Sequence, residues 1–279
     1  MPEDSANWIN PGIRGMAPVG RRRVDPELHR LQWNENATGF PAELKEEVLQ
    51  RLSALDWARY PHGLRPWVLI ERLAAYCGVQ PEQVVVSDGS SDLIKMVMAA
   101  ILPPGATVVM PNPTFLLYGL NAQMQQARVV DIPLRPEDDF ALPAQQIIEA
   151  SHAHKAQLVV ICAPNNPTGT FYPTDVLADV VKHCHGLVLI DEAYAEFCDQ
   201  DLTHLLANGR VVLLRTLSKV FAMAGVRRTS YWCGSCRRSE RCWTTCTSSM
   251  RCSSPTWKTT PAWTTTFAFL SARPPRTIS

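Results

Sequence analysis

The sequence has no apolar run long enough to cross a membrane, and it has almost no net charge. A membrane-spanning helix needs roughly 18–20 apolar residues, and no segment of the 279-residue chain approaches that length. The formal net charge of +1 gives no sign of a nucleic-acid or membrane partner. The first residues also lack a positive segment followed by an apolar one, so we expect no secretory signal. These absences predict a soluble protein.

Paired cysteines are also missing from the first 227 residues. Cys77, Cys162, Cys184 and Cys198 each stand alone in an apolar pattern. Isolated cysteines of this kind are typical of reduced thiols in a cytosolic protein, so we predict a cytoplasmic location. A chain of this length can bury a full core, and we expect one large domain with a smaller piece.

Residues 228–279 contain no aspartate, no valine and one leucine, Leu270. They carry eight Arg and Lys against one Glu, a balance of +7 that leaves −6 for residues 1–227. A segment with so little aliphatic surface cannot offset the entropy that ordering costs. We therefore divide the chain into an N-terminal arm (1–33), a large domain (34–227) and an aberrant tail (228–279), which we expect to be disordered or the product of a frameshift.

The tail admits two explanations. Cysteines at loose zinc-ligand spacing could form a metal module; they are Cys233, Cys236, Cys242 and Cys246. The second pair is followed by no partner motif, which weakens this hypothesis and leads us to predict no metal. Alternatively, GC-rich codons for residues 236–246, shifted by one base, can encode an ordinary amphipathic helix. We favour the frameshift.

In the body of the chain, short apolar runs alternate with amphipathic helical patterns. This alternation predicts an α/β fold, a mostly parallel sheet wrapped by helices. The predicted strands are 84–86, 107–110, 128–132, 158–162, 187–190 and 211–214. The predicted helices are 41–55, 66–76, 91–101, 115–126, 143–152 and 173–184.

Polar residues follow three of the predicted strands. Asn166 follows one buried strand, Asp191 the next, and Lys219 a third. The carboxyl ends of parallel strands share one edge of a sheet, which is where ligands bind in open α/β folds. An amine nucleophile, a buried carboxylate and an amide or phenol donor are the groups that pyridoxal phosphate chemistry requires. Taken singly, each residue has a plainer explanation: Asn166 as part of a turn, Asp191 as a helix cap and Lys219 as part of a surface loop.

Three further features fit a phosphorylated, flat ligand. Ser87–Asp92 joins a strand to a helix, whose free N–H groups can cradle a phosphate, although plain helix capping explains it equally well. Phe115 stands at the next strand-to-helix turn, where it can stack on a ring or fill the core. Arg227, eight residues after Lys219, is a candidate phosphate ligand.

With these residues assembled, residues 1–227 resemble the class I/II aminotransferases of fold type I, and within them the histidinol-phosphate aminotransferases. Further motifs that carry the resemblance are Asn34-Glu35-Asn36, Arg59-Tyr60-Pro61 and Thr216-Leu217-Ser218-Lys219. The resemblance implies pyridoxal 5'-phosphate as cofactor, with Lys219 as the Schiff-base lysine and Asp191 on the pyridine nitrogen.

The resemblance also implies roles for the other motif residues. Asn166 and Tyr194 match the donors to the ring oxygen, and Phe115 matches the stacking residue. The phosphate would be held by a set drawn from four segments, namely Ser90, Ser91, Asp92, Ser218, Arg227 and Tyr60. Tyr60 would come from the other subunit, which implies a homodimer.

The implied reaction is transamination between glutamate and imidazole acetol phosphate, with Lys219 as general base and acid. After Arg227 the pattern breaks, so we expect the main sheet to lose one strand and no later residue to align. We assign no substrate-binding arginine and expect poor turnover. A threonine-phosphate decarboxylase and an inactive pseudoenzyme with a basic tail remain alternatives.

Overall fold

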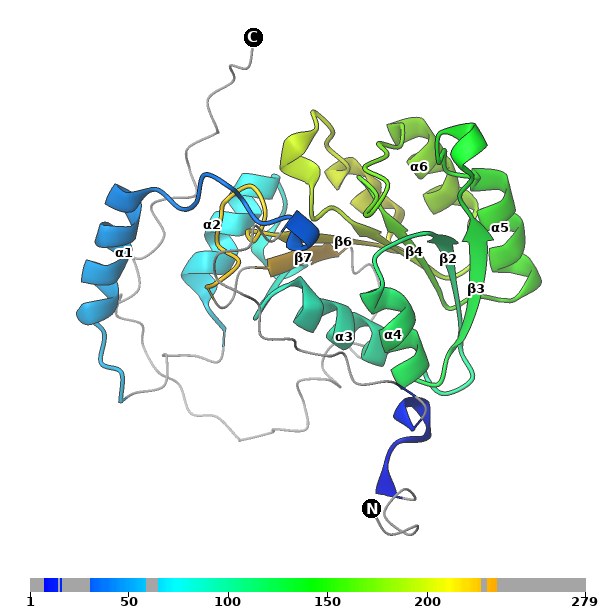
Figure 1. Ribbon diagram of the computed structural model, residues 1–279, viewed down its shortest axis with the longest axis horizontal. Helices are drawn as coiled ribbons and strands as arrows, with labels where there is room; N and C mark the ends of the chain where they lie inside the picture. Colours follow the sequence, from blue (N-terminus) through cyan, green and yellow to red (C-terminus); the bar gives the residue numbers. More distant parts are fainter. Residues whose placement is uncertain (1–7, 15, 17–30, 59–64, 227–229, 235–279) are drawn as a thin grey trace.

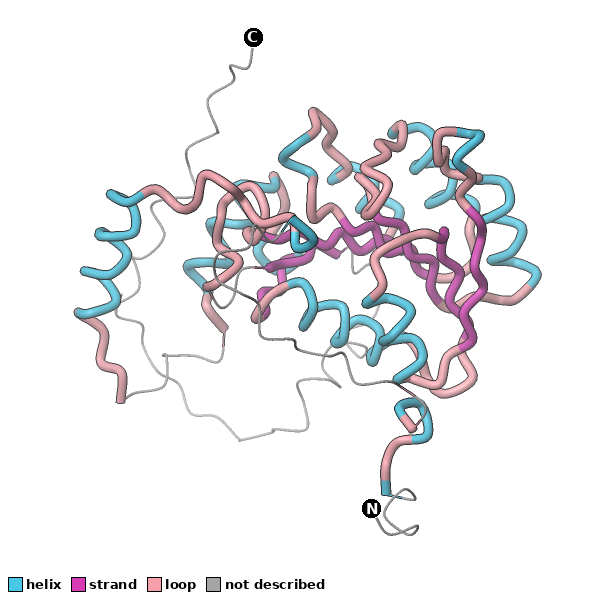
Figure 2. Tube along the Cα trace, in the orientation of Figure 1, coloured by secondary structure: helices cyan, strands magenta, loops and turns pink. Residues whose placement is uncertain are grey.

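A seven-stranded sheet forms the centre of the protein, in the order β1-β7-β6-β5-β4-β2-β3 (Figures 1 and 2). The structure, a computed structural model, describes residues 8–14, 16, 31–58, 65–226 and 230–234. The strands are β1 (Val84–Ser87), β2 (Thr107–Asn112), β3 (Arg128–Pro133), β4 (Leu158–Cys162), β5 (Leu187–Asp191), β6 (Val211–Thr216) and β7 (Ser230–Gly234). The neighbours from β6 to β3 pair in parallel, which confirms the predicted fold class.

Helices cover both faces of the sheet because alternate strand residues point in opposite directions. Val108 and Met110 pack in a cluster with α3 and α4, whereas Val109 between them belongs to the cluster with α2, α5 and α6. The helices are α1 (Ala42–Ser53), α2 (Trp67–Cys77), α3 (Ser90–Ile101), α4 (Leu117–Met124), α5 (Ala144–Ala153) and α6 (Thr174–His183). The predicted helices are all found, with ends shifted by a few residues.

Short 3₁₀ turns complete the chain between these elements. They are η2 (Pro11–Ile13), η3 (Leu31–Trp33), η4 (Pro81–Gln83), η5 (Pro136–Asp138), η6 (Ala195–Phe197) and η7 (Thr203–Asn208). Helix α2 ends at Gly78, whose φ of 69° is left-handed and favours glycine. Of the helices in the described residues, none is long and apolar enough to cross a membrane.

Strand β7 corrects the expectation that the sheet loses a strand after Arg227. Residues 230–234 lie between β1 and β6 and pair antiparallel with both. The segment Ser-Tyr-Trp-Cys-Gly carries two aromatic residues that favour strands, and it fills a gap that would leave two unpaired edges. The valine strand β1 lies at the edge of the sheet, and Val84 is its one buried residue.

Residues 10–12 of the N-terminal arm rest on the end of α4. Asn10 Nδ2 donates to the carbonyl of Met124 at 3.3 Å. A Cβ atom on Gly12 would lie 2.4 Å from the carbonyl oxygen of Gln123, so the close approach requires glycine. This contact fixes η2 to the helix that follows β2.

Candidate active site

A cavity of about 610 Å³ lies where β4, β5 and β6 end, at the edge predicted from the sequence. Most of the predicted site residues line it together, namely Ser90, Ser91, Phe115, Asn166, Asp191, Tyr194, Ser218 and Lys219. Asp92 does not line it; its carboxylate accepts a hydrogen bond from the Ser87 hydroxyl. Tyr60 and Arg227 lie outside the described residues.

Asp191 is the buried anion of the cavity. The last residue of β5, it is 5% exposed, and its two oxygens accept from the Tyr118 hydroxyl at 2.7 Å and the Ala193 N–H at 3.0 Å. Burial raises the pKa of Asp191 to about 6, against the opposing effect of these two hydrogen bonds and of Lys219. The carboxyl group is therefore mostly ionised at pH 7, although it titrates well above the ordinary range of an aspartate.

Lys219 brings an amine into the same cavity. It follows β6, and its Nζ donates to the Trp33 carbonyl at 2.8 Å and lies 5.7 Å from the centre of the Tyr194 ring. Burial lowers the pKa of Lys219, while the charges of Glu35 and Asp191 oppose the shift. A lowered amine pKa increases the fraction of neutral amine, which is the form that attacks a carbonyl carbon.

Two donors converge beside this amine. The hydroxyl of Tyr194 lies 3.5 Å from Asn166 Nδ2 and accepts a hydrogen bond from Asn34 Nδ2 at 2.8 Å. Burial raises the pKa of Tyr194, with the Asn34 hydrogen bond opposing. The phenol thus keeps its proton, and Tyr194 and Asn166 can both donate to one oxygen in the cavity.

The start of α3 supplies a cradle for an anion. The cap residue Gly89 has a φ of 100°, a left-handed conformation that favours glycine. The N–H groups of Asp92 and Leu93 donate to the Gly89 carbonyl, and in the described residues those of Ser90 and Ser91 have no acceptor. Free N–H groups at a helix start bind phosphate.

Sequence reasoning assigned no role to several residues that the structure brings to the site. Residues 32–35 line the cavity, and Asn36 Nδ2 donates to the Val220 carbonyl at 3.0 Å. The Asn34-Glu35-Asn36 motif drew attention to this segment in the sequence, but it did not predict that the segment lines the cavity. Tyr118 lies in the first turn of α4, three residues after Phe115, and this closeness to Phe115 was its only local signal.

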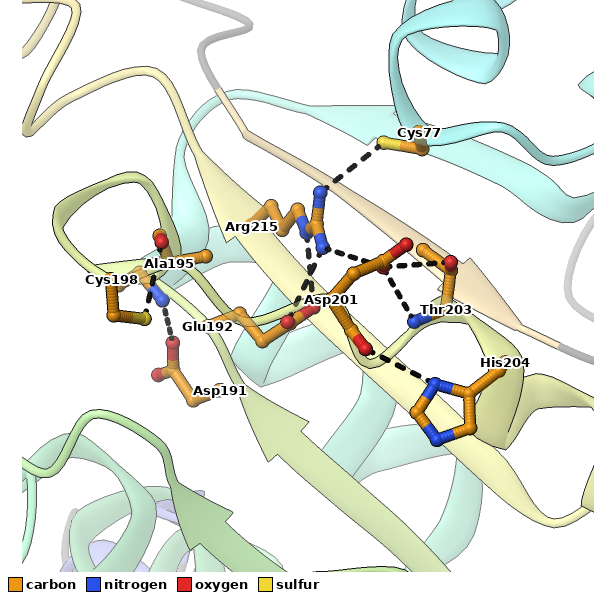
Figure 3. Close-up of polar contacts among 10 residues, drawn as sticks. Cys77, Asp191, Glu192, Ala195, Cys198, Asp201, Thr203, His204 and Arg215 are labelled. Atoms are coloured by element: carbon orange, nitrogen blue, oxygen red, sulfur yellow. Dashed lines mark hydrogen bonds and ion pairs between the residues drawn. The ribbon is translucent and has the colours of Figure 1, made fainter. Parts of the chain in front are cut away.

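A buried ion pair joins the residue that follows β5 to β6 (Figure 3). Arg215 Nε and Nη2 donate to the two oxygens of Glu192 at 3.0 and 3.3 Å, and both residues are buried. Asp201 lies 4.0 Å from the same guanidinium, and Cys77 Sγ lies 3.8 Å from Nη1. Glu192 follows Asp191, and Arg215 precedes Lys219 by four residues, so the pair fixes both functional strand ends.

Asp191 should make the stability of the cofactor-free protein depend on pH. Its folded pKa of about 6 exceeds the ordinary 3.8, so its contribution is full at low pH and is lost as pH rises through 6. We expect this group to lower the free energy of unfolding by about 1.4 kcal/mol between pH 5 and pH 7. Denaturant unfolding of the wild type and Asp191→Asn at both pH values measures it. Equal pH dependence in the two proteins would contradict the expectation.

The fold and the lining of the cavity are those of the large domain of fold type I, one class of enzymes that use pyridoxal 5'-phosphate. The chain belongs to the class I and II aminotransferase family, whose model, described as "Aminotransferase class I and II", matches residues 26–273. The match runs past Arg228, so the expectation that no later residue would align is wrong.

Relatives with similar sequences carry one name. The chain is 33% identical to the histidinol-phosphate aminotransferase of Chlorobium limicola over 229 residues, which is 81% of this chain and 64% of the relative. It is 38% identical to that of Thermococcus gammatolerans over 199 residues, 71% of this chain and 56% of the relative. The chain therefore spans less than two thirds of the length of these relatives.

Solved structures agree on the fold. Histidinol-phosphate aminotransferase from Sinorhizobium meliloti, solved in complex with pyridoxal-5'-phosphate, superposes with a TM-score of 0.68 at 22% identity, over 81% of this chain and 62% of that one. A double mutant of Thermus thermophilus aspartate aminotransferase gives a TM-score of 0.64 at 26% identity, over 72% and 55%.

Proposed function

We propose that the protein is a pyridoxal-phosphate-dependent aminotransferase that exchanges an amino group between glutamate and imidazole acetol phosphate, giving histidinol phosphate. The observation that carries the proposal is the convergence of Lys219, Asp191 and Tyr194 in one cavity. The names of the relatives at 33–38% identity support this choice of substrate.

The residues present fit the cofactor. A cavity of about 610 Å³ offers a half-buried amine, a buried carboxylate with capacity to accept a further hydrogen bond, and a helix start with free N–H groups. Phe115 lines the cavity and can stack on a flat ring. The phosphate would be held by Ser90, Ser91 and Ser218, with Asp92, Arg227 and the partner's Tyr60 as further predicted ligands.

Each side chain has a task in this proposal. Bound pyridoxal phosphate supplies a ring that withdraws electrons from the α-carbon of an amino acid. Asp191 accepts a hydrogen bond from the ring nitrogen and keeps it protonated. Asn166 and Tyr194 donate to the ring oxygen and orient the ring. Lys219 would hold the cofactor covalently through its amine and would move the proton at the substrate's α-carbon.

Three further predictions belong to the proposal. The protein would act as a homodimer in the cytoplasm, with Tyr60 contributed across the interface. Turnover of the chain as given would be weak, because we assign no arginine to the carboxylate or phosphate of the substrate. The tail from residue 228 would remain an aberrant segment that does not belong to the large domain, although residues 230–234 form β7.

A direct assay tests the function. The purified chain is incubated with pyridoxal phosphate, glutamate and imidazole acetol phosphate, and 2-oxoglutarate and histidinol phosphate are measured. We expect both products in equal amounts, at a low rate. Carbon dioxide release from threonine phosphate, without oxo-acid formation, would instead identify the decarboxylase. Cofactor binding with neither reaction would favour the pseudoenzyme.

A further inference from the structure

The buried tyrosine Tyr118 contacts the carboxylate that the proposed function assigns to the cofactor ring. It lies on α4, its side chain is 0% exposed, and its hydroxyl donates to Asp191 Oδ2 at 2.7 Å. Its ring stands edge-on to Phe115, with centroids 6.3 Å apart and an interplanar angle of 78°. Tyr118 thus joins the ring-stacking residue to the carboxylate.

The carboxylate of Asp191 can accept further hydrogen bonds from a group bound in the cavity. An ionised carboxylate can accept about four hydrogen bonds. The described residues supply two of them, from the Tyr118 hydroxyl to Oδ2 and from the Ala193 N–H to Oδ1. Because Asp191 also lines the cavity, a bound donor can use what remains.

The surroundings of Asp191 decide its protonation. The titratable groups that act on it from its own strand and from neighbouring elements are Tyr118, Cys162, Glu192, Tyr194 and Lys219. Burial and Glu192 favour the neutral acid, whereas Tyr118, Ala193 and Lys219 favour the carboxylate. Burial and the charge of Asp191 hold the pKa of Tyr118 well above its usual value, so the phenol keeps its proton and remains a donor.

We propose that Tyr118 is a positioning residue, whose hydroxyl holds Asp191 ionised and directed into the cavity where the cofactor's ring nitrogen would bind. The part of this inference that concerns the cofactor rests on the proposed function. The effect on Asp191 itself does not, because it belongs to the cofactor-free protein.

Tyr172 provides a matched control. It is also a fully buried tyrosine, 1% exposed, but its hydroxyl has no hydrogen-bond partner among the residues that the structure describes. Tyr118→Phe and Tyr172→Phe therefore remove the same atom from a buried position. Only the first removal takes a hydrogen bond from Asp191.

The experiment uses the full chain and two pH titrations of each variant. The first follows the free energy of unfolding without cofactor, and the second the dissociation constant for pyridoxal phosphate. A hydrogen bond to a charged group changes an equilibrium about tenfold or more. Tyr118→Phe should therefore raise the midpoint pH of both titrations by about one unit or more. Tyr172→Phe should leave both unchanged, and Asp191→Asn should remove the transition.

Each outcome decides the proposal. Unchanged midpoints in Tyr118→Phe, with stability alone reduced, would overturn it. If the wild type binds no pyridoxal phosphate at any pH, the proposed function fails, and the cofactor-free midpoint still decides the role of Tyr118. If Tyr118→Phe does not fold, the double variant Tyr118→Phe/Asp191→Asn should fold, because the buried charge is gone. A double variant that also fails to fold would overturn the proposal.

Discussion

Replacement of Lys219 by alanine is expected to abolish the covalent attachment of pyridoxal phosphate and to lower kcat by about 10⁴-fold. Lys219 is placed in the cavity by the end of β6, and burial lowers its pKa toward the reactive neutral amine. The visible absorbance of the bound cofactor and the rate of 2-oxoglutarate formation measure the two effects.

Two control variants test whether the reaction needs the amine of Lys219 or only its positive charge. Lys219→Arg keeps the positive charge, but a guanidinium remains protonated and cannot act as the nucleophile, so it should lose activity as fully as alanine does. Lys182→Ala, on the exposed side of α6, should leave both readouts unchanged. Retention of turnover within about tenfold by Lys219→Ala would exclude Lys219 as the catalytic base.

Arg215→Met should destabilise the protein by about 3–5 kcal/mol, because it leaves the Glu192 carboxylate buried without its cation. The two side chains are 8% and 1% exposed and share two hydrogen bonds. Because Glu192 follows Asp191 directly, we expect weaker cofactor binding as well. Denaturant unfolding gives the loss of stability.

The matched control is the exposed pair of Arg135 and Glu137, whose charged atoms lie 4.0 Å apart. Arg135→Met is the same substitution in water, and it should cost less than about 1 kcal/mol. Arg215→Met combined with Glu192→Gln should lose less than the sum of the single variants, because the second change removes the unpaired charge. Additive losses would show that the pair is not coupled.

The convergence of the site could be predicted because it follows from local patterns. Each strand that leads to Asn166, Asp191 and Lys219 is a short apolar run with a polar end, and parallel pairing brings such ends to one edge. The structure confirms that these residues line one cavity. The helices were predictable for the same reason, since the spacing of their apolar residues is local.

The remaining contacts depend on tertiary packing and left little trace in the sequence. Tyr118 and Asp191 are 73 residues apart, and Asn34 and Tyr194 are 160 apart. No spacing rule connects residues at such separations. Strand β7 was missed because five residues without an aliphatic run, beside a segment rich in serine and threonine, carry only a weak strand pattern.

The position of β7 has a consequence for synthesis of the protein on the ribosome. The strand is the last in the chain among the described residues, yet it lies between β1 and β6, and β1 precedes it by more than a hundred residues. The nascent chain can therefore build the parallel strands early but cannot close the sheet until residue 234 has emerged. Until then β1 and β6 each present an open edge, which is the feature that chaperones must shield against aggregation.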